Sequence, residues 1–144
     1  MQILNRTANF NYLITEEIEA GIILLGSEVK SLREGKASIK EAYIAEKNSD
    51  LYLINSNISE FKNAGRFNHP PKRERKLLLN NKQINKIIGQ INHQGLSAIP
   101  LKIYFNKKRF AKVLIGIGKG KKLYDKRESI KQRDDNRRKL RGEE

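Results

Sequence analysis

The chain has 144 residues and a mass of 16.6 kDa, which is enough for one domain with one hydrophobic core. It contains no cysteine, which excludes disulfide frameworks and thiolate metal sites, and no apolar run approaches the roughly 20 residues that a membrane-spanning helix needs. The start of the sequence, Met1 to Arg6, lacks the basic region and apolar stretch of a secretion signal. We therefore expect a cytoplasmic protein.

The charge balance is strongly basic. Lys and Arg number 30 against 16 Asp and Glu, which gives a net charge of +14 and a sequence pI near 10.1. Lys and Arg gain affinity for polyanions by releasing counterions from phosphates, so a nucleic acid is the expected partner. Two alternatives are a basic protein that is merely soluble and one that binds a membrane surface. The second would need a basic amphipathic helix with a broad apolar face, which the basic stretches lack.

The first elements in the chain are two predicted strands and a short helix. Residues 9–15 alternate between apolar and polar, and residues 18–25 are more continuously apolar, with Gly21 as a bulge or a point of close approach. Ser27 is predicted to cap a helix that runs through Arg33, with Glu28 at its positive end. Gly35 follows as a left-handed stop, and Val29 and Leu32 are the expected inward contacts.

The middle of the chain combines a hairpin with a long loop. Residues 42–46 and 51–55 are predicted to pair as strands around a turn at 47–50. Periodicity then fails from Phe61 to Lys76, which predicts an exposed loop that closes on the basic run 72–76. The three leucines 77–79 are expected to return to the core.

The last part of the body has the clearest pattern. Ile84, Ile87, Ile88 and Ile91 follow the i, i+3, i+4, i+7 spacing of one helix face, with Asn80 or Asn81 as the cap and Gly95 as the end. Residues 98–105 and 110–117 then form a second hairpin, in which Pro100 suits a strand start or an edge. About six short antiparallel strands with two or three helices predict a closed or nearly closed oligonucleotide-binding-like β-barrel, because a barrel removes sheet edges.

The domain organisation is a barrel body over residues 1–124 and a basic tail over residues 125–144. The tail has eight basic and six acidic residues, and only Ile130 and Leu140 are large and apolar. Such a segment buries too little surface to offset its ordering entropy, so we predict a tail that is disordered when free. It lacks proline and would place Arg133 and Arg137 on one helix face, which predicts a helix on a phosphate-rich partner. The alternative is a frayed tail without function.

The residues offer little support for catalysis or metal binding. His69 and His93 are 24 positions apart without a partnering cysteine, so a zinc site is not expected and both are predicted to lie at the surface. Residues 116–122 resemble a phosphate-binding loop but have the wrong spacing, with Ile115 and Lys122 where Gly and Ser or Thr are required. No nucleophile, base and acid set emerges, so we expect a protein that is not an enzyme and binds no cofactor. The rival from another class is a small nuclease that uses His69.

Basic residues interleaved with aromatic residues are the recurring feature of the chain. They occur at Arg66 and Phe67, at 107–112 around Phe110, and at 119–127 around Tyr124. This combination suits RNA, because phosphates bind cations and unstacked bases stack on rings. A general binder of structured or ribosomal RNA would satisfy the same pattern.

Several longer motifs resemble the SsrA-binding protein (small protein B) family, the bacterial partners of transfer-messenger RNA. The resemblance runs from Asn5 to at least Lys131. The motifs that carry it are Glu19-Ala20-Gly21, Gly26-Ser27-Glu28-Val29-Lys30-Ser31-Leu32-Arg33, Arg75-Lys76-Leu77-Leu78-Leu79, Ala111-Lys112-Val113 and Gly120-Lys121-Lys122-Leu123-Tyr124-Asp125-Lys126-Arg127.

This resemblance implies a non-enzymatic factor that rescues stalled ribosomes. Family members bind the tRNA-like domain of transfer-messenger RNA through the barrel and help to deliver it, with elongation factor Tu, to the vacant A site. Their tail becomes helical along the empty mRNA path near the small-subunit decoding centre. A monomer is expected.

The resemblance also assigns residues to two functions. The positions implied for RNA binding are Asn5, Glu19, Arg75, Lys76, Leu78 and Lys112. Those implied for the decoding region and tail are Gly120, Lys121, Lys122, Tyr124, Asp125, Lys126, Arg127, Lys131, Arg133 and Arg137. For Leu78, core packing is an equally good interpretation, and Asp125 is as well suited to pairing with a neighbouring Arg or Lys as to touching RNA.

The sequence departs from the family pattern at three places. Thr7 stands where the family more often has a basic residue, and the turn at 106–109 lacks a glycine often found there. The tail ends at Arg141-Gly142-Glu143-Glu144, shorter and more acidic than in many relatives. A short acidic end predicts a shorter reach along the mRNA path.

Overall fold

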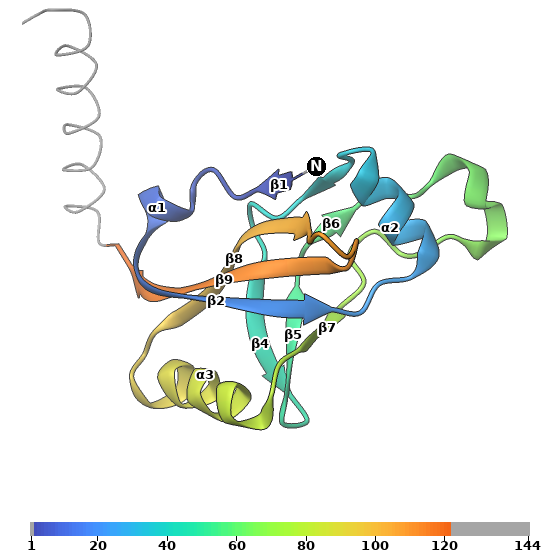
Figure 1. Ribbon diagram of the computed structural model, residues 1–144. Helices are drawn as coiled ribbons and strands as arrows, with labels where there is room; N and C mark the ends of the chain where they lie inside the picture. Colours follow the sequence, from blue (N-terminus) through green and yellow to red (C-terminus); the bar gives the residue numbers. More distant parts are fainter. Residues whose placement is uncertain (1, 122–144) are drawn as a thin grey trace, which may run out of the picture.

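A computed structural model describes residues 2–121 of the chain, which form a curved antiparallel sheet with helices at its margins (Figure 1). The helices are α1 (Ala8–Asn11), α2 (Gly26–Arg33), the 3-10 helix η1 (Lys62–Phe67) and α3 (Asn81–His93). The strands are β1 (Gln2–Leu4), β2 (Tyr12–Ile22), β3 (Ala37–Ser38), β4 (Tyr43–Lys47), β5 (Asp50–Ile54), β6 (Asn57–Ile58), β7 (Arg75–Leu78), β8 (Ser97–Phe105) and β9 (Ala111–Gly120).

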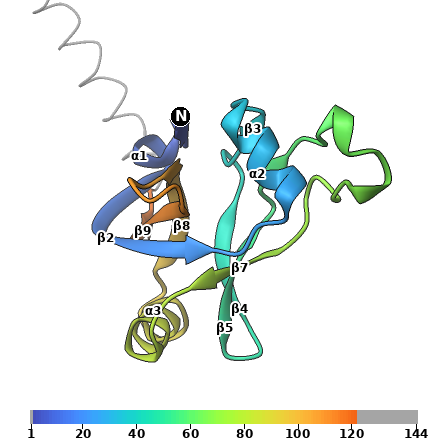
Figure 2. The same ribbon diagram turned by 45° about the vertical axis from the view of Figure 1, so that its right-hand side comes forward.

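Seven strands form one sheet in the order β1-β8-β9-β2-β7-β5-β4, and β3 pairs with β6 separately. Figure 2 shows the sheet folded so that β8, β9 and β2 lie on one side and β5 and β4 on the other. The mainly antiparallel, oligonucleotide-binding-like prediction is therefore confirmed.

Of the two predicted forms, closed and nearly closed, the structure excludes the closed barrel, because no backbone ladder joins β4 to β8. The edge of β8 that could close the barrel is already occupied. Strand β1 pairs with residues 102–104, and Asn5 follows with its backbone N–H on the Leu101 carbonyl (2.9 Å) and its side-chain amide on the Pro100 carbonyl (2.9 Å). Pro100 itself has no N–H to offer a further strand. The sheet stays open at this seam.

The amino-terminal prediction of two strands is also corrected. Residues 8–11 form the helical turn α1, in which the N–H groups of Phe10 and Asn11 bond to the Thr7 carbonyl at 3.2 and 3.0 Å. The two predicted strands are one strand, β2, whose register shifts between Ile14 and Glu16. Such an irregularity changes which side chains face the core, so the apolar pattern before it differs from the pattern after it, and one strand looks like two in the sequence. Gly21 is a point of close approach: a Cβ there would lie 3.1 Å from Leu78 Cβ.

Helix α2 begins one residue before the predicted cap. Leu25 is the N-cap, and its backbone N–H donates to the Glu28 carboxylate at 2.7 Å, so Ser27 lies within the first turn and is buried. The predicted inward residue Leu32 is fully buried, and Gly35 ends the helix with a φ of 72°. Helix termini need partners for their free N–H groups, and here a glutamate provides one.

The β4–β5 hairpin, α3 and the β8–β9 hairpin follow the sequence patterns closely, whereas β3, β6, η1 and the start of β7 lie where these patterns predict no element. Asn48 and Ser49 both have positive φ, at 54° and 66°, as a two-residue hairpin turn between β4 and β5 requires. Asn80 caps α3 by accepting the Gln83 N–H at 2.8 Å, and Gly95 follows the helix with a φ of 65°. The β8–β9 hairpin is confirmed and extends to Gly120.

The core fills the concave side of the sheet. Its fully buried members alternate along the strands and include Leu51, Leu53, Ile103, Val113 and Ile115, and helix α3 adds its apolar face from below. In the described part of the chain no helix is long and apolar enough to cross a membrane.

Candidate nucleic-acid interface

The strand register aligns several of the predicted RNA-binding residues in one row. Leu78 on β7 lies opposite Gly21 on β2, Gly21 opposite Lys112 on β9, and Lys112 opposite Tyr104 on β8. Residues directly opposite one another in antiparallel strands project from the same side of the sheet. The row therefore places Leu78, Lys112 and Tyr104 side by side.

This row lies on the outer side of the sheet. The neighbours of its members along each strand, such as Leu77, Val113 and Ile103, are buried in the core. Since successive side chains alternate between faces, the row and its i±2 neighbours face outward. We call this surface the strand face, which consists of Glu19, Lys76, Leu78, Lys102, Tyr104 and Lys112.

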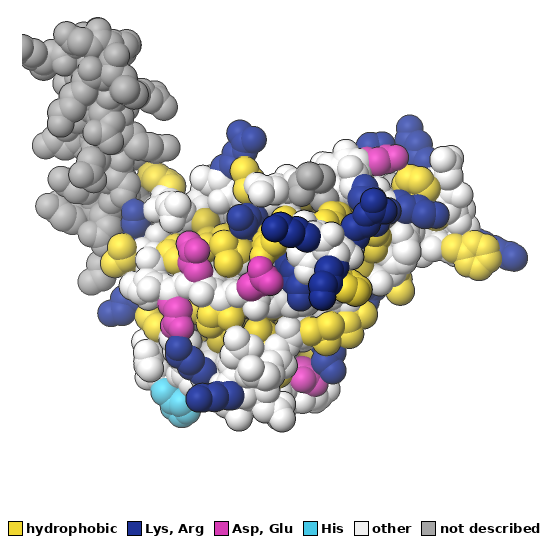
Figure 3. All heavy atoms as spheres, viewed as in Figure 1, with side chains coloured by type: hydrophobic (Ala, Val, Ile, Leu, Met, Phe, Trp, Pro, Cys, Tyr) yellow, Lys and Arg dark blue, Asp and Glu magenta, His cyan; other side chains and the backbone are white. Residues whose placement is uncertain are grey.

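Charge is unevenly distributed around the strand face. Figure 3 shows acidic side chains along the earlier part of β2, whereas Lys and Arg side chains gather towards its end, where α2 approaches. Arg33 of α2 lies 5.5 Å from the ring centroid of Phe105 at the end of β8, on the side of the sheet that faces the core. The arrangement joins a cationic area to exposed apolar and acceptor groups.

Glu19 has a fixed partner on the strand face. The Tyr104 hydroxyl donates a hydrogen bond to the Glu19 carboxylate, and the Lys102 ammonium lies 5.0 Å from the centroid of the Tyr104 ring. Burial, together with the hydrogen bond to Glu19 and its negative charge, raises the pKa of Tyr104 to about 12. Tyr104 therefore stays protonated at neutral pH and holds the carboxylate as an oriented acceptor.

Leu78 does not return to the core with Leu77. Its side chain is 52 % exposed, while Leu77 is 1 % exposed. The core-packing interpretation of Leu78 is therefore wrong, because the pleat turns the middle leucine outward. Leu78 offers an apolar surface, and its side chain packs over the buried Gly21 of β2.

Arg75 and Lys76, the two basic residues that precede Leu77 and Leu78, have different environments. Lys76 is partly exposed, and its ammonium pairs with Asp50 at 3.4 Å. Arg75 is fully buried, and its Nε donates to the Glu28 carboxylate at 2.5 Å. The expectation that Arg75 contacts RNA is corrected, because its side chain belongs to the interior.

Glu28 holds Arg73, in the loop before β7, and Arg75, the first residue of β7. One oxygen accepts from Arg73 at 2.5 Å and the other from Arg75, whose remaining donors reach Ser56 and the Pro71 carbonyl. Burial by itself raises the pKa of Glu28, but the hydrogen bonds from Arg73 and the Leu25 N–H and the charge of Arg75 hold it below its usual range. Both oxygens of the buried carboxylate are used: one accepts from Arg73 and the Leu25 N–H, and the other from Arg73 and Arg75.

His69 is buried as well, at 2 % exposure, so the surface prediction for it is wrong. One ring nitrogen lies 2.7 Å from the Ser27 hydroxyl and the other 2.9 Å from the Ile58 carbonyl. Both nitrogens are engaged, and the ring is closed off from solvent. This geometry removes the support for a nuclease built on His69. His93 is exposed, as predicted. We call Ser27, Glu28, Ser56, His69, Arg73 and Arg75 the interior cluster.

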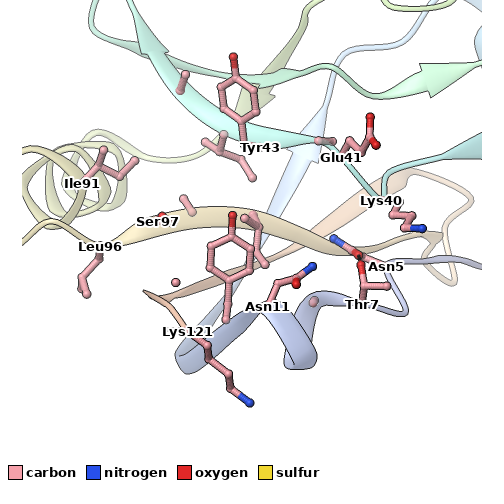
Figure 4. Close-up of a pocket in the computed structure, with 18 of the residues that line it drawn as sticks. Asn5, Thr7, Asn11, Lys40, Glu41, Tyr43, Ile91, Leu96, Ser97 and Lys121 are labelled. Carbon is pink, nitrogen blue, oxygen red and sulfur yellow. Dashed lines mark hydrogen bonds between the residues drawn. The ribbon is translucent and has the colours of Figure 1, made fainter. Parts of the chain in front are cut away.

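Asn5 lies away from the strand face, at a groove of about 760 Å³ beside the open seam between β4 and β8. Figure 4 shows Asn5, Thr7 and Lys40 at one end of the groove and Ile91 and Leu96 at the other. Gly120 and Lys121 also line it, and the Lys121 N–H donates to the Asn11 carbonyl at 2.8 Å. The structure thus brings Asn5 together with the start of the tail segment rather than with Lys112.

The other tail positions lie outside the described residues. They are Lys122, Tyr124, Asp125, Lys126, Arg127, Lys131, Arg133 and Arg137. The boundary between body and tail at 124/125 and the predicted disorder of the free tail lie there too.

Sequence reasoning missed Tyr104 and Lys102. In the sequence both are simply polar positions that alternate with the apolar residues of β8. The signal that could have found them is the hairpin register, since pairing Tyr104 with Lys112 follows once the turn length is fixed. Among residues 2–121, no group of three or more His, Asp or Glu side chains could hold a metal ion.

Comparison with known proteins places the chain among proteins of one family. The family model described as SmpB protein matches residues 2–143. The chain belongs to the SmpB family. Two curated relatives, both named SsrA-binding protein, come from Wolbachia sp. subsp. Drosophila simulans (strain wRi) and Nitrobacter winogradskyi. The first is 61% identical over 137 residues, covering 95% of this chain and 92% of the relative. The second is 58% identical over 130 residues, covering 90% of this chain and 83% of the relative.

A solved structure adds agreement in three dimensions. The structure described as "tmRNA-SmpB: a journey to the center of the bacterial ribosome" contains a chain that is 42% identical to this one. The structural match between the two chains covers 85% of each and has a TM-score of 0.71. This SmpB-family chain therefore shares the fold as well as the sequence motifs of the family.

Proposed function

We propose that this chain binds the tRNA-like domain of transfer-messenger RNA through the strand face and helps to deliver it to stalled ribosomes for trans-translation. The observation that carries the proposal is the convergence of Glu19, Leu78 and Lys112, which are far apart in the sequence, on one outward surface. The relatives named SsrA-binding protein and the solved tmRNA-SmpB structure support it.

The chemistry of the strand face fits RNA. Lys112 supplies a cation for phosphate, and Leu78 supplies an apolar surface for a ribose or an unstacked base. The oriented carboxylate of Glu19 accepts from ribose hydroxyls or base amino groups, which is how a protein distinguishes RNA from a simple polyanion. The proposed role is therefore binding, without catalysis.

The remaining partners follow from the same role. The chain acts as a monomer in the cytoplasm, in a delivery complex with elongation factor Tu, and its residues from Gly120 onward work at the small-subunit decoding centre and along the mRNA path. Gly120 and Lys121 lie at the groove beside α1, on the opposite end of β9 from Lys112. The separation supports a division between RNA capture by the body and ribosome contact by the tail.

A gel-shift competition tests the RNA preference. Full-length chain bound to labelled transfer-messenger RNA is challenged with unlabelled tRNA-like domain, ordinary tRNA or a ribosomal RNA fragment of equal length. We expect only the tRNA-like domain to compete efficiently. Equal competition by all three would instead support a general binder of structured RNA.

Deletion of residues 125–144 tests the division of labour. We expect affinity for transfer-messenger RNA to stay within about twofold, because the strand face is intact, while peptide tagging on stalled ribosomes is lost. Tagging is measured in a reconstituted translation reaction on a truncated mRNA. A large loss of RNA affinity would contradict the proposed division.

A further inference from the structure

The loop from Phe61 to His69, which we call the aromatic loop, exposes a ring that the strand face does not use. Phe67 is 74 % exposed, the highest value among the large hydrophobic residues found exposed. The Arg66 guanidinium carbon lies 5.0 Å from the centroid of this ring. An exposed aromatic ring paired with an arginine has the composition of a nucleobase-stacking site.

The aromatic loop is closed by one side chain rather than by a strand ladder. The Asn68 side chain accepts the Phe61 N–H at 2.9 Å and donates to the Phe61 carbonyl at 2.8 Å. In this way its amide pairs with the Phe61 backbone as a peptide unit would. Gly65, with a φ of 56°, supplies the bend at the tip. The exposed Phe67 ring therefore lies on a turn that is held by hydrogen bonds.

The base of the aromatic loop is fixed to the body. His69 is buried between Ser27 and the Ile58 carbonyl, and the Ser31 hydroxyl of α2 donates to the Ser59 carbonyl at 2.6 Å. The Phe61 ring lies 5.5 Å from the Lys30 ammonium of the same helix. Both ends of the loop are thus attached to α2, which limits the ordering entropy that binding would otherwise cost.

The position of the loop separates it from the strand face. In Figures 1 and 2 it projects beyond α2, away from β8 and β9. An RNA element that covers Lys112 and Leu78 lies on the other side of α2. The local charge also favours RNA, because the exposed ionisable residues of the aromatic loop, Lys62 and Arg66, are both basic.

We propose that the aromatic loop is a second RNA contact, in which Phe67 stacks on an unpaired nucleobase of ribosomal RNA while Arg66 pairs with an adjacent phosphate. The inference deepens the proposed function, because it names the contact that the body makes after the strand face has captured transfer-messenger RNA. Stacking requires the π-face of the ring, so shape and hydrophobicity alone are not sufficient.

The test separates the two RNAs. Phe67→Ala chain is measured first for affinity to the isolated tRNA-like domain and then, in complex with transfer-messenger RNA, for association with ribosomes stalled on a truncated mRNA. We expect the first affinity to stay within about twofold and the second to fall about 5- to 150-fold, the range for loss of one stacked base. If the wild-type chain failed to bind the tRNA-like domain, the proposed function would fail instead.

Matched variants keep the result interpretable. Phe67→Tyr retains the ring and should restore ribosome association, whereas Phe67→Leu retains the apolar bulk and should not. Asn68→Ala keeps Phe67 but removes the side chain that closes the loop, so it should give an intermediate loss of ribosome association. Thermal melts of the three Phe67 variants should match the wild type within a few degrees, because Phe67 is largely exposed.

Crosslinking identifies the partner directly. A photoreactive phenylalanine analogue at position 67 should crosslink to ribosomal RNA in the stalled complex. Crosslinks confined to transfer-messenger RNA or to ribosomal protein would overturn the inference, as would wild-type ribosome association by Phe67→Ala.

Discussion

The interior cluster and the strand face contain the same kinds of residue in opposite surroundings. In the interior cluster, Glu28 is fully buried and holds Arg73 and Arg75. On the strand face, Glu19 is exposed and is held by Tyr104. A buried charged group must form its hydrogen bonds with other groups of the same protein, whereas an exposed charged group can still bind a ligand. The first arrangement therefore supports the fold, and the second is available to RNA.

The strongest way to test this difference is to truncate Arg75. Arg75→Ala leaves the Glu28 carboxylate buried with one partner fewer, so we expect the free energy of unfolding to fall by about 3–5 kcal/mol. Urea titration measures the loss. Lys76→Ala is the matched control on the next residue, whose exposed pair with Asp50 contributes about 1 kcal/mol or less. Similar effects of the two variants would refute the assignment of Arg75 to the interior.

Acid should weaken the interior cluster. The folded-state pKa of Glu28 lies below the ordinary value of 4.5, so its ionised form contributes stability that is fully present above pH 4.5 and is lost as the pH falls through the folded-state pKa. We expect Glu28→Gln to be less stable at neutral pH and to lose less of its stability below pH 4.5. Unfolding curves between pH 7 and pH 3 measure both. Parallel pH profiles for wild type and variant would argue against this role of Glu28.

Substitutions on the strand face should change the affinity for RNA rather than the free energy of unfolding. Lys112→Glu is expected to weaken binding of transfer-messenger RNA by about tenfold and to lower the salt dependence of log K by about one ion, because one phosphate contact is lost. Filter binding at several salt concentrations gives both values. An unchanged slope would mean that Lys112 faces away from phosphate.

The smallest expected effect concerns the orientation of Glu19. Tyr104→Phe removes the hydroxyl but keeps the ring, so we expect an affinity loss of about two- to tenfold, the range for one hydrogen bond. The same substitution in a Glu19→Ala background should have no further effect. If the two losses simply add, Tyr104 contacts RNA by itself rather than through Glu19.

The comparison also explains how far the sequence could lead. Hydrophobic periodicity located α3, the β4–β5 hairpin and the β8–β9 hairpin, because their apolar residues recur at the spacing of one face. The motif resemblance led to Glu19, Leu78 and Lys112, which the register then placed together. The order and pairing of the strands turned these separate residues into one surface.

Other features had no local signal. Arg75 and Lys76 are adjacent basic residues, and only the pleat decides that the first points inward and the second outward. Likewise, His69 lies in a loop rich in Asn and Pro, and its burial depends on Ser27, which is 42 positions away. The open seam follows from Asn5 occupying the edge of β8, a contact 95 positions apart in the chain. Long-range pairing of this kind is not encoded in a short window.

The ladder between β2 and β9 has a mechanical consequence. It runs from Gly21 and Lys112 at the strand face to Tyr12 and Gly120 at the groove, and one further backbone bond ties Lys121 to Asn11. With a rise of about 3.3 Å per residue, this strut is roughly 25 Å long. A pull on the chain beyond residue 121, directed along β9, loads these hydrogen bonds together in shear instead of peeling them one by one. A force applied at the groove end of this ladder is thus transmitted to the strand face with little extension of the ladder.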